Sequence, residues 1–280
     1  QRSGSRGTYS GFSKRLVPEI EMNWRMPFVK KEDNVSQVIE PIVAAITSPY
    51  GGNHDKIPNE DSLEMEFDDT NIFSSNRFSG IDRVEGGPRL SYGLKWGVYG
   101  DAGGSTRVFM GQSWRPKTDD TFSTGSGLED NFSDIVGRVD VSPGDYLDIS
   151  YRTRFSPENL SPDRNEISLL AGVPAFYLKS NYIFLDHQSN SEFVGREELD
   201  LTASSKIDRY WRSEIKSIRD MASSEFRSAG LALTYEDECF IFTARGNRTF
   251  YEDRDIKPTD AILFNIMLKT IGSLPPLDIN

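Results

Sequence analysis

The chain has 280 residues, 36% hydrophobic and 27% charged, with a formal net charge of -11 at pH 7. Nucleic-acid-binding proteins carry a basic footprint, so this charge argues against a nucleic-acid partner. No run of roughly eighteen apolar residues occurs, which excludes a transmembrane helix but leaves open a transmembrane β-barrel, whose strands alternate apolar and polar residues.

The first residues, QRSGSRGTYSGF, contain neither an initiator Met nor the apolar core of a signal peptide. We therefore expect the sequence to be a fragment of a longer protein. Cys239 is the one cysteine, and His54 and His187 are the two histidines. These are too few ligands for a typical zinc site, so we expect neither a metal nor a cofactor.

Alternation of apolar and polar residues, typical of strands, recurs along the whole chain. In PEIEMNWRM (18–26) the apolar residues Ile20, Met22 and Trp24 alternate with polar ones, and DYLDISYRTRF (145–155) and AILFNIMLKT (261–270) show the same period. We expect about thirteen or fourteen strands, at residues 18–26, 36–47, 89–99, 106–115, 133–142, 145–155, 164–173, 175–186, 195–204, 207–218, 225–235, 239–249 and 259–270.

The length and polar faces of these strands favour a membrane barrel. Most are about ten residues long, more than the five or six usual in soluble proteins, and close to the roughly 9–11 that cross a bilayer. Polar faces carry successive charges, such as Arg212, Glu214 and Lys216, which a dry core would not tolerate. From alternation alone, a soluble sheet with one solvated face remains an alternative.

The connectors alternate in length. Short ones are expected at 100–104, 142–145, 173–175, 204–205 and 235–238, and longer ones at 47–88, 116–132, 156–163, 187–194, 218–224 and 249–258. Outer-membrane barrels have this plan, with tight periplasmic turns and extended external loops. A Greek-key sandwich has no reason to keep it.

The longest connector and its flanks carry a specific series of motifs. IEP (39–41) is followed by IPNEDS (57–62), FDDTNIF (67–73), RFSGIDR (77–83) and SYGL (91–94). Together they resemble the LptD family of outer-membrane lipopolysaccharide (LPS)-assembly proteins, formerly called organic-solvent-tolerance proteins. The resemblance runs over essentially the whole chain, residues 1–280. It implies the C-terminal half of a twenty-six-stranded barrel, without the periplasmic jelly-roll domain and the first barrel strands.

The resemblance also implies that 47–88 folds into and over the mouth of the barrel. We expect Arg77, Asp82 and Arg83 to hold it there by charge-assisted hydrogen bonds, and Gly80 to form a turn that a β-carbon would strain. The same motif includes Asn71, Phe73 and Phe78. The alternative is a solvated acidic loop; its run DSLEMEFDD lacks the spacing of an EF-hand, so calcium is a minor possibility.

Cys239 matches a cysteine that the family links by a disulfide to the jelly-roll domain, so the resemblance implies a bond to a cysteine outside this sequence. Glu238 stands where some family members have a second cysteine, so only one such bond is implied. Counting connectors places 235–238 among the short periplasmic turns, in a compartment that favours disulfides. A buried free thiol is the alternative.

The last strand, 259–270, resembles the strand that closes the family's barrel and forms one side of a proposed lateral gate. Ile262, Phe264, Ile266 and Leu268 would then face lipid, while Asn265, Met267 and Lys269 would face inward. The partner strand of this seam is expected outside the sequence.

Function follows from the resemblance: a transport component of the Gram-negative outer membrane, not an enzyme, that inserts LPS through a hydrophilic lumen and a lateral gate. The implied partners are LPS, the plug lipoprotein LptE and the periplasmic Lpt bridge, reached through the N-terminal domain. No P-loop motif is present, so the energy would come from upstream delivery. Two alternatives are a general porin, which does not explain RFSGIDR, and a soluble carbohydrate hydrolase with Asp68 and Glu85 as acid and base.

Overall fold

The computed structural model describes residues 14–54, 57, 59–186, 195–250, 257–269, 272–273 and 277–279. The secondary structure assigned within these ranges is one 16-stranded antiparallel sheet. The strands are β1 (Ile20–Arg25), β2 (Phe28–Glu32), β3 (Val35–Thr47), β4 (Arg89–Gly100), β5 (Ser105–Trp114), β6 (Ile135–Gly144), β7 (Leu147–Phe155), β8 (Pro162–Val173), β9 (Phe176–Leu185), β10 (Arg196–Lys206), β11 (Trp211–Asp220), β12 (Glu225–Glu236), β13 (Phe240–Thr249), β14 (Asp260–Leu268), β15 (Gly272–Ser273) and β16 (Leu277–Ile279). Among the described residues, no helix has the length and hydrophobicity needed to cross a membrane.

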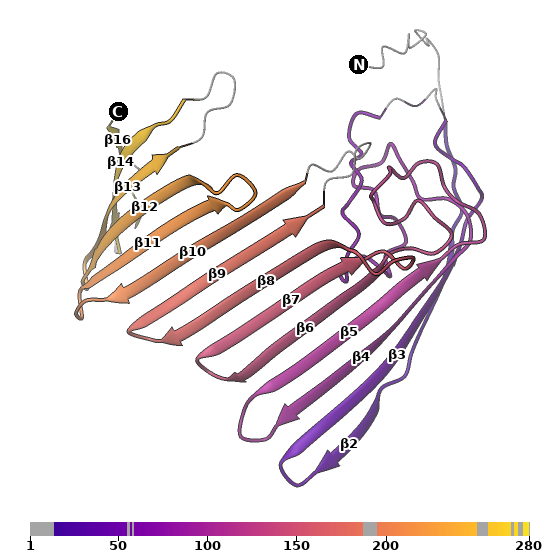
Figure 1. Cartoon of the computed structure of the whole chain (residues 1–280), viewed down its shortest axis with the longest axis horizontal. Coiled ribbons are helices and arrows are strands. Elements are labelled where there is room, and N and C mark those ends of the chain that lie inside the picture. The colour runs from indigo at the N-terminus through magenta and orange to yellow at the C-terminus, as the bar shows by residue number, and fades with distance from the viewer. Residues whose placement is uncertain are drawn as a thin grey trace.

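The strands form an up-and-down meander, because from β3 to β14 each one pairs with its neighbours in sequence. One edge is formed by β1 and β2, which both pair with β3, and the other by β15 and β16, which both pair with β14. Figure 1 shows that the inclined strands make a curved wall whose two ends bend away from the viewer. No pairing joins these two edges among the described residues, so the sheet has the form of an incomplete barrel.

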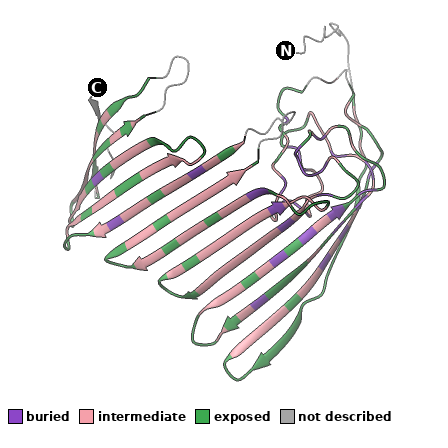
Figure 2. Ribbon diagram, in the orientation of Figure 1, coloured by how far each residue is buried: buried purple, intermediate pink, exposed green. Residues whose placement is uncertain are grey.

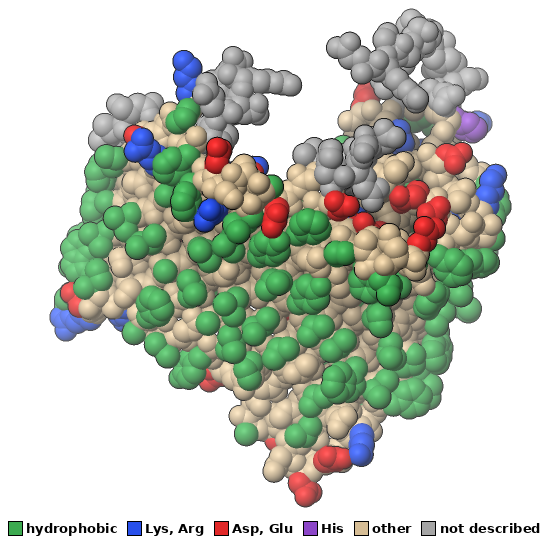
Figure 3. All heavy atoms as spheres, viewed as in Figure 1, with side chains coloured by type: hydrophobic (Ala, Val, Ile, Leu, Met, Phe, Trp, Pro, Cys, Tyr) green, Lys and Arg blue, Asp and Glu red, His purple; other side chains and the backbone are tan. Residues whose placement is uncertain are grey.

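The two faces of the wall differ in chemistry. One cross-strand row consists of Trp96, Val108, Val139, Tyr151, Ile167, Tyr182 and Leu199. The neighbouring row on the opposite face consists of Lys95, Phe109, Arg138, Arg152, Glu166, Ile183, Glu198 and Asp220. We call these the outer and the inner face. Figure 3 views the outer face, where hydrophobic side chains cover most of the strands.

The prediction of an all-β antiparallel fold is confirmed, with differences at a few turns. The expected first strand, 18–26, is β1, and a further strand that was not predicted, β2, follows it after Pro27, which lacks the N–H that a strand interior needs. The turn expected at 204–205 lies instead at 207–210, where Asp208 Oδ1 accepts hydrogen bonds from the N–H groups of Tyr210 (2.7 Å) and Trp211 (2.8 Å). The connector expected to be long at 218–224 is a short turn, because β11 and β12 extend to Asp220 and Glu225.

Two long segments, 48–88 and 115–134, fold together at one end of the wall, beside the inner face of β5 and β6. A cluster of seven buried residues lies there: Phe67, Ile72, Phe78, Phe109, Phe122, Leu128 and Val136. Figure 2 shows the buried residues gathered mostly at this end, while the remaining strands are mainly half-buried or exposed. The largest described core of the protein therefore joins these segments to the wall.

Candidate functional site

Aromatic packing docks the 48–88 segment on the inner face. The ring of Phe78 stacks on Phe122 with centroids 5.0 Å apart, and Phe73 meets Phe109 of β5 edge-on at 6.1 Å. On β5, Gly111 makes room for the side chain of Ile72, since a β-carbon at position 111 would lie 2.8 Å from Ile72 Cδ1. Of the expected motif, Phe73 therefore packs against the wall, and Phe78 packs against the 115–134 segment.

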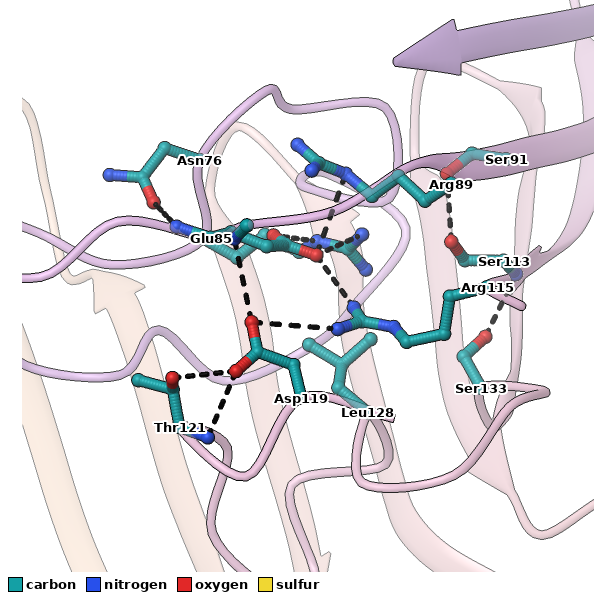
Figure 4. Close-up of polar contacts among 12 residues, drawn as sticks. Asn76, Glu85, Arg89, Ser91, Ser113, Arg115, Asp119, Thr121, Leu128 and Ser133 are labelled. Carbon is teal, nitrogen blue, oxygen red and sulfur yellow. Dashed lines mark hydrogen bonds and ion pairs between the residues drawn. The ribbon is translucent and has the colours of Figure 1, made fainter. Parts of the chain in front are cut away.

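A buried carboxylate, Glu85, binds three arginines at the end of the wall where the segments 48–88 and 115–134 lie (Figure 4). Arg77 Nε and Nη2 donate to its two oxygens at 2.9 Å each, and Arg115 Nη2 donates at 2.6 Å. Arg89 Nε lies 3.5 Å from Glu85 Oε1. The side chains of Arg77 and Glu85 have no exposed area, so strong charges are held in a dry site. This Glu85 cluster ties the segment to β4 and to residue 115, next to the end of β5.

The electrostatics of the Glu85 cluster are those of a structural ion-pair network. Burial lowers the pKa of Arg77 to about 10, yet the guanidinium stays charged at neutral pH. Asp119 adds a second carboxylate, 4.0 Å from Arg115 Nη1. Four guanidinium nitrogens, Nη1 of Arg77, Arg89 and Arg115 and Nε of Arg89, are buried without a hydrogen-bond partner. Loss of the central carboxylate would therefore leave several uncompensated charges.

The RFSGIDR turn is a reciprocal clamp between residues 60–62 and 80–83. Asp82 Oδ2 accepts hydrogen bonds from the N–H groups of Glu60 (2.8 Å) and Asp61 (3.0 Å). In return, Asp61 Oδ1 accepts from the N–H groups of Ile81 (3.1 Å) and Asp82 (3.0 Å). The structure brings Arg83 into the clamp through its backbone N–H, which donates to Ser62 Oγ at 2.9 Å, whereas we expected a role for its side chain.

Gly80 sits where the clamp turns. Its φ is +75°, a conformation that side chains with a β-carbon rarely adopt. A β-carbon at this position would also lie 2.5 Å from Asp61 Oδ1 and 2.6 Å from the Asp61 carbonyl oxygen. The clamp therefore requires glycine for two independent reasons.

A second set of ion pairs, which sequence reasoning missed, joins the acidic run to arginines on the inner face of β6–β8. Asp69 lies 3.4 Å from Arg138 Nη1 and 3.7 Å from Arg152 Nε. Arg164 Nη1 lies 3.3 Å from Glu66 and 3.7 Å from Asp68. The acidic run is thus not simply solvated. Arginines at alternate positions of the expected strands, such as Arg152 and Arg154, were the available signal.

Asn71 shapes the acidic run from within. Its Nδ2 donates to the Glu66 carbonyl at 2.7 Å, and its Oδ1 accepts from the Asp68 N–H at 3.0 Å. The carboxylate of Asp68 also accepts from Thr70, at 2.8 and 2.6 Å. Asp68 and Glu85, the pair considered for sugar hydrolysis, are therefore engaged in a turn and in a dry cluster. This arrangement gives no support to a catalytic pair.

The 115–134 segment is fixed by Arg154 of β7. Its guanidinium donates to the carbonyl oxygens of Ser126 (3.1 Å) and Gly125 (3.0 Å), and its Nε lies 3.3 Å from Asp134. Burial raises the pKa of Asp134 to about 7, and although Arg154 opposes this shift, nearby Asp163 and Glu129 add to it. This end of the wall thus contains a carboxyl group that titrates near neutral pH.

Cys239 lies at the other end of the wall, in the turn between β12 and β13. It is a free and exposed cysteine, which does not match the alternative of a buried thiol. Asp237 Oδ1 accepts from the N–H groups of Cys239 (2.7 Å) and Phe240 (2.9 Å), and the Cys239 carbonyl accepts from the Lys269 N–H at 2.9 Å. A rigid turn therefore presents the thiol to solvent.

The last long strand, β14, keeps the expected two faces. Phe264 and Ile266 pair with Ala244 and Phe242 of β13, and the rings of Phe242 and Phe264 stack at 6.1 Å. By the same register, Ile262 and Leu268 share this outer face, while Asn265 pairs with Thr243 on the inner face. Among the described residues, the second edge of β14 pairs with the short strands β15 and β16.

Comparison with known proteins agrees with these features. The family model "LPS transport system D" matches residues 1–211. The chain is similar to the LPS-assembly protein LptD of Psychrobacter cryohalolentis, with 26% identity over 88% of this chain and 25% of that protein. It is also similar to the proteins of the same name from Acinetobacter baumannii, with 23% identity over 92% of this chain and 32% of the relative, and from Aeromonas hydrophila, with 32% identity over 33% of this chain and 12% of the relative. The chain thus spans at most about a third of the length of these three relatives, and it belongs to the LptD family.

Proposed function

We propose that the sheet is part of the wall of a Gram-negative outer-membrane barrel that transports LPS to the outer leaflet. The observation that carries this proposal is the contrast between the faces of the same strands. On β7 and β8, Tyr151 and Ile167 pair on the outer face, whereas Arg152 and Glu166 pair on the inner face. A sheet with an apolar outer face and a charged inner face is suited to contact lipid on the outside and polar groups on the inside. Membership of the LptD family, whose relatives are named for LPS assembly, supplies the cargo.

Transport of this amphiphile requires no covalent chemistry. The saccharide part would pass along the charged inner face, and the acyl chains would leave sideways where the wall can open. We propose the edge of β14 as that lateral gate, with Ile262, Phe264, Ile266 and Leu268 toward lipid and Asn265 inward. The support is that, within the part of the chain that the structure describes, the edge of β14 away from β13 pairs with five residues, two in β15 and three in β16.

The segment 47–88 would act as a plug in the external mouth of the barrel. Its attachment uses the motif residues Asn71, Phe73, Arg77, Phe78, Gly80, Asp82 and Arg83, through the hydrophobic core, the Glu85 cluster and the clamp. These contacts support a plug that is folded against the wall. They make an open, water-filled general porin the weaker alternative.

The remaining partners follow from the proposed orientation. We propose that Cys239, at the end of the wall with the short turns, faces the periplasm and forms a disulfide with an N-terminal domain that connects to the periplasmic Lpt bridge. The inner face of β11–β13, including Glu214, Lys216 and Arg245, lies beyond the plug and would contact the lipoprotein LptE. The exposed thiol in a rigid turn supports the first of these assignments.

Conditional depletion of the complete protein tests the proposed function. Newly made LPS, followed by a pulse label and by modification from outside the cell, should stop reaching the surface as the protein is depleted. Re-expression of the complete protein should restore export. Normal surface LPS together with a loss of small-solute uptake would instead indicate a porin and contradict the proposal.

A further inference from the structure

The plug is attached to the wall in two physically different ways. The Glu85 cluster is tight, with hydrogen bonds of 2.6–2.9 Å and fully buried side chains of Arg77 and Glu85. The contacts of Asp69 with Arg138 and Arg152 are longer, 3.4 and 3.7 Å, and the arginine side chains are 30% and 29% exposed. The Asp69 side chain is itself only 8% exposed, but its contacts are longer than those of the Glu85 cluster and its arginine partners reach solvent, so its carboxylate is the easier one to displace.

A cavity of about 500 Å³ opens on the inner face directly beside Asp69. Its lining comes from β3–β6 and from the plug, and includes Lys95, Arg107 and Arg138 together with the rings of Phe73 and Phe109. This volume falls within the range of small-molecule sites, roughly 300–1,000 Å³. Cations combined with aromatic rings suit a ligand that carries an anionic group on a sugar ring.

Charge in and beside this cavity is compensated in part by the plug itself. Four cations, Lys95, Arg107, Arg138 and Arg152, face the carboxylates of Glu40, Asp69 and Asp140. Asp140 is bound by Arg138 Nε at 2.9 Å, so it is part of the wall's own network, as is Arg107 at 3.7 Å. Asp69 is the carboxylate that the plug brings in, and its withdrawal would leave four cations against two carboxylates.

We propose that Lys95, Arg107, Arg138 and Arg152 form a binding site for the phosphate group of a phosphorylated saccharide, and that Asp69 is the carboxylate that competes for it. This inference rests on the proposed function, since LPS would be the natural source of such a group. A phosphate takes over the contacts of Asp69 with Arg138 and Arg152 and so displaces Asp69 and its neighbours 68–70, while Phe67 and Ile72 stay in the buried core. The Glu85 cluster keeps residues 77–89 in place meanwhile.

Binding of glucose 1-phosphate to the complete purified protein tests the site, with glucose and inorganic phosphate as comparison ligands. Asp69→Asn should tighten binding of glucose 1-phosphate about fivefold or more, because a competing ligand is removed. Lys95→Ala and Arg107→Ala, two exposed positions, should weaken it by a similar factor. Glu238→Gln, an exposed residue in the turn between β12 and β13 and remote from the cavity, is the control and should change nothing.

A second readout follows the plug. Hydrogen exchange of the 68–70 backbone should accelerate when glucose 1-phosphate binds the wild type and should be fast in Asp69→Asn without ligand, while 77–89 stays protected. Equal affinity of wild type and Asp69→Asn would overturn the competition, and equal affinity for glucose 1-phosphate and inorganic phosphate would overturn the saccharide. Binding is measured without transport, so a failed LPS-export test would leave these outcomes distinct from it.

Discussion

The guanidinium of Arg77 and the carboxylate of Glu85 form two parallel hydrogen bonds of 2.9 Å each, with neither side chain exposed to solvent. Arg77 opens the RFSGIDR motif and Glu85 follows it by two residues, so this pair closes the motif into a loop. Because Arg89 and Arg115 reach the same carboxylate, one short stretch is joined to β4 and to residue 115 after β5. The folded position of the plug depends most on this contact.

Glu85→Gln should free the plug. The change leaves three buried arginines without their central charge, and breaking a buried pair costs about 3–5 kcal/mol. We expect faster proteolysis within 47–88 and higher permeability of cells to large antibiotics. Glu60→Gln removes an exposed carboxylate of the same segment and is the control. Equal proteolysis of the two variants would contradict the role of the cluster.

Gly80→Ala should damage the clamp more than Gly51→Ala. Both glycines have positive φ, +75° and +79°, so each substitution carries a backbone penalty of about 1 kcal/mol. Only at position 80 does the new β-carbon collide, with Asp61 at 2.5 Å, since nothing lies within 4 Å of the one at position 51. Thermal unfolding and protease resistance of the complete protein should show the difference, and similar losses would argue against the steric explanation.

Asp134→Asn should flatten the pH dependence of stability. The pKa of Asp134 is raised to about 7 by burial, while the same carboxyl in an unfolded chain titrates near 4. Between these values the folded protein holds a proton that the unfolded chain has lost, so stability falls as pH rises through this range. Melting temperatures at pH 5 and pH 8 should differ more in the wild type than in Asp134→Asn. An unchanged difference would assign the dependence to other groups.

Cys239→Ser should abolish a thiol-dependent mobility shift in non-reducing electrophoresis of the complete protein from membranes. The exposed thiol lies in a turn at the end of the wall that we assign to the periplasm, where disulfides persist. Treatment with a reductant should give wild type and variant the same mobility. A shift that survives in the variant would show that another cysteine carries the bond.

Strand-level features could be predicted because they depend on a local period. β7 and β14 have the expected faces, since a pleated strand sends alternate side chains to opposite sides. The β10–β11 turn was predicted at 204–205, five residues or fewer from its observed place, because two consecutive serines are typical of a turn. The position of the turn is set instead by Asp208, whose side chain accepts two backbone hydrogen bonds.

The site was predictable only in part. The motif pointed to Arg77, Gly80 and Asp82, but not to their partners. Arg115 lies 30 residues from Glu85 in the chain, and Asp69 lies 69 residues from Arg138. Such contacts arise from the path of a long segment over a curved wall, and no local period encodes that path. Charge alternation on a strand shows that partners are needed without showing which ones.

Photocrosslinking from two adjacent positions of β8 shows whether LPS in transit touches the inner face of the wall. Ser168 pairs with Ser150 and Asn181 on the inner face, whereas Ile167 pairs with Tyr151 and Tyr182 on the outer face. With a photoreactive amino acid at position 168 of the complete protein, pulse-labelled LPS should crosslink early and disappear during the chase. Position 167 should show no such transient. If LPS in transit crosslinks at position 168 no more than at Asp101 in a distant turn, this wall does not line the path of LPS.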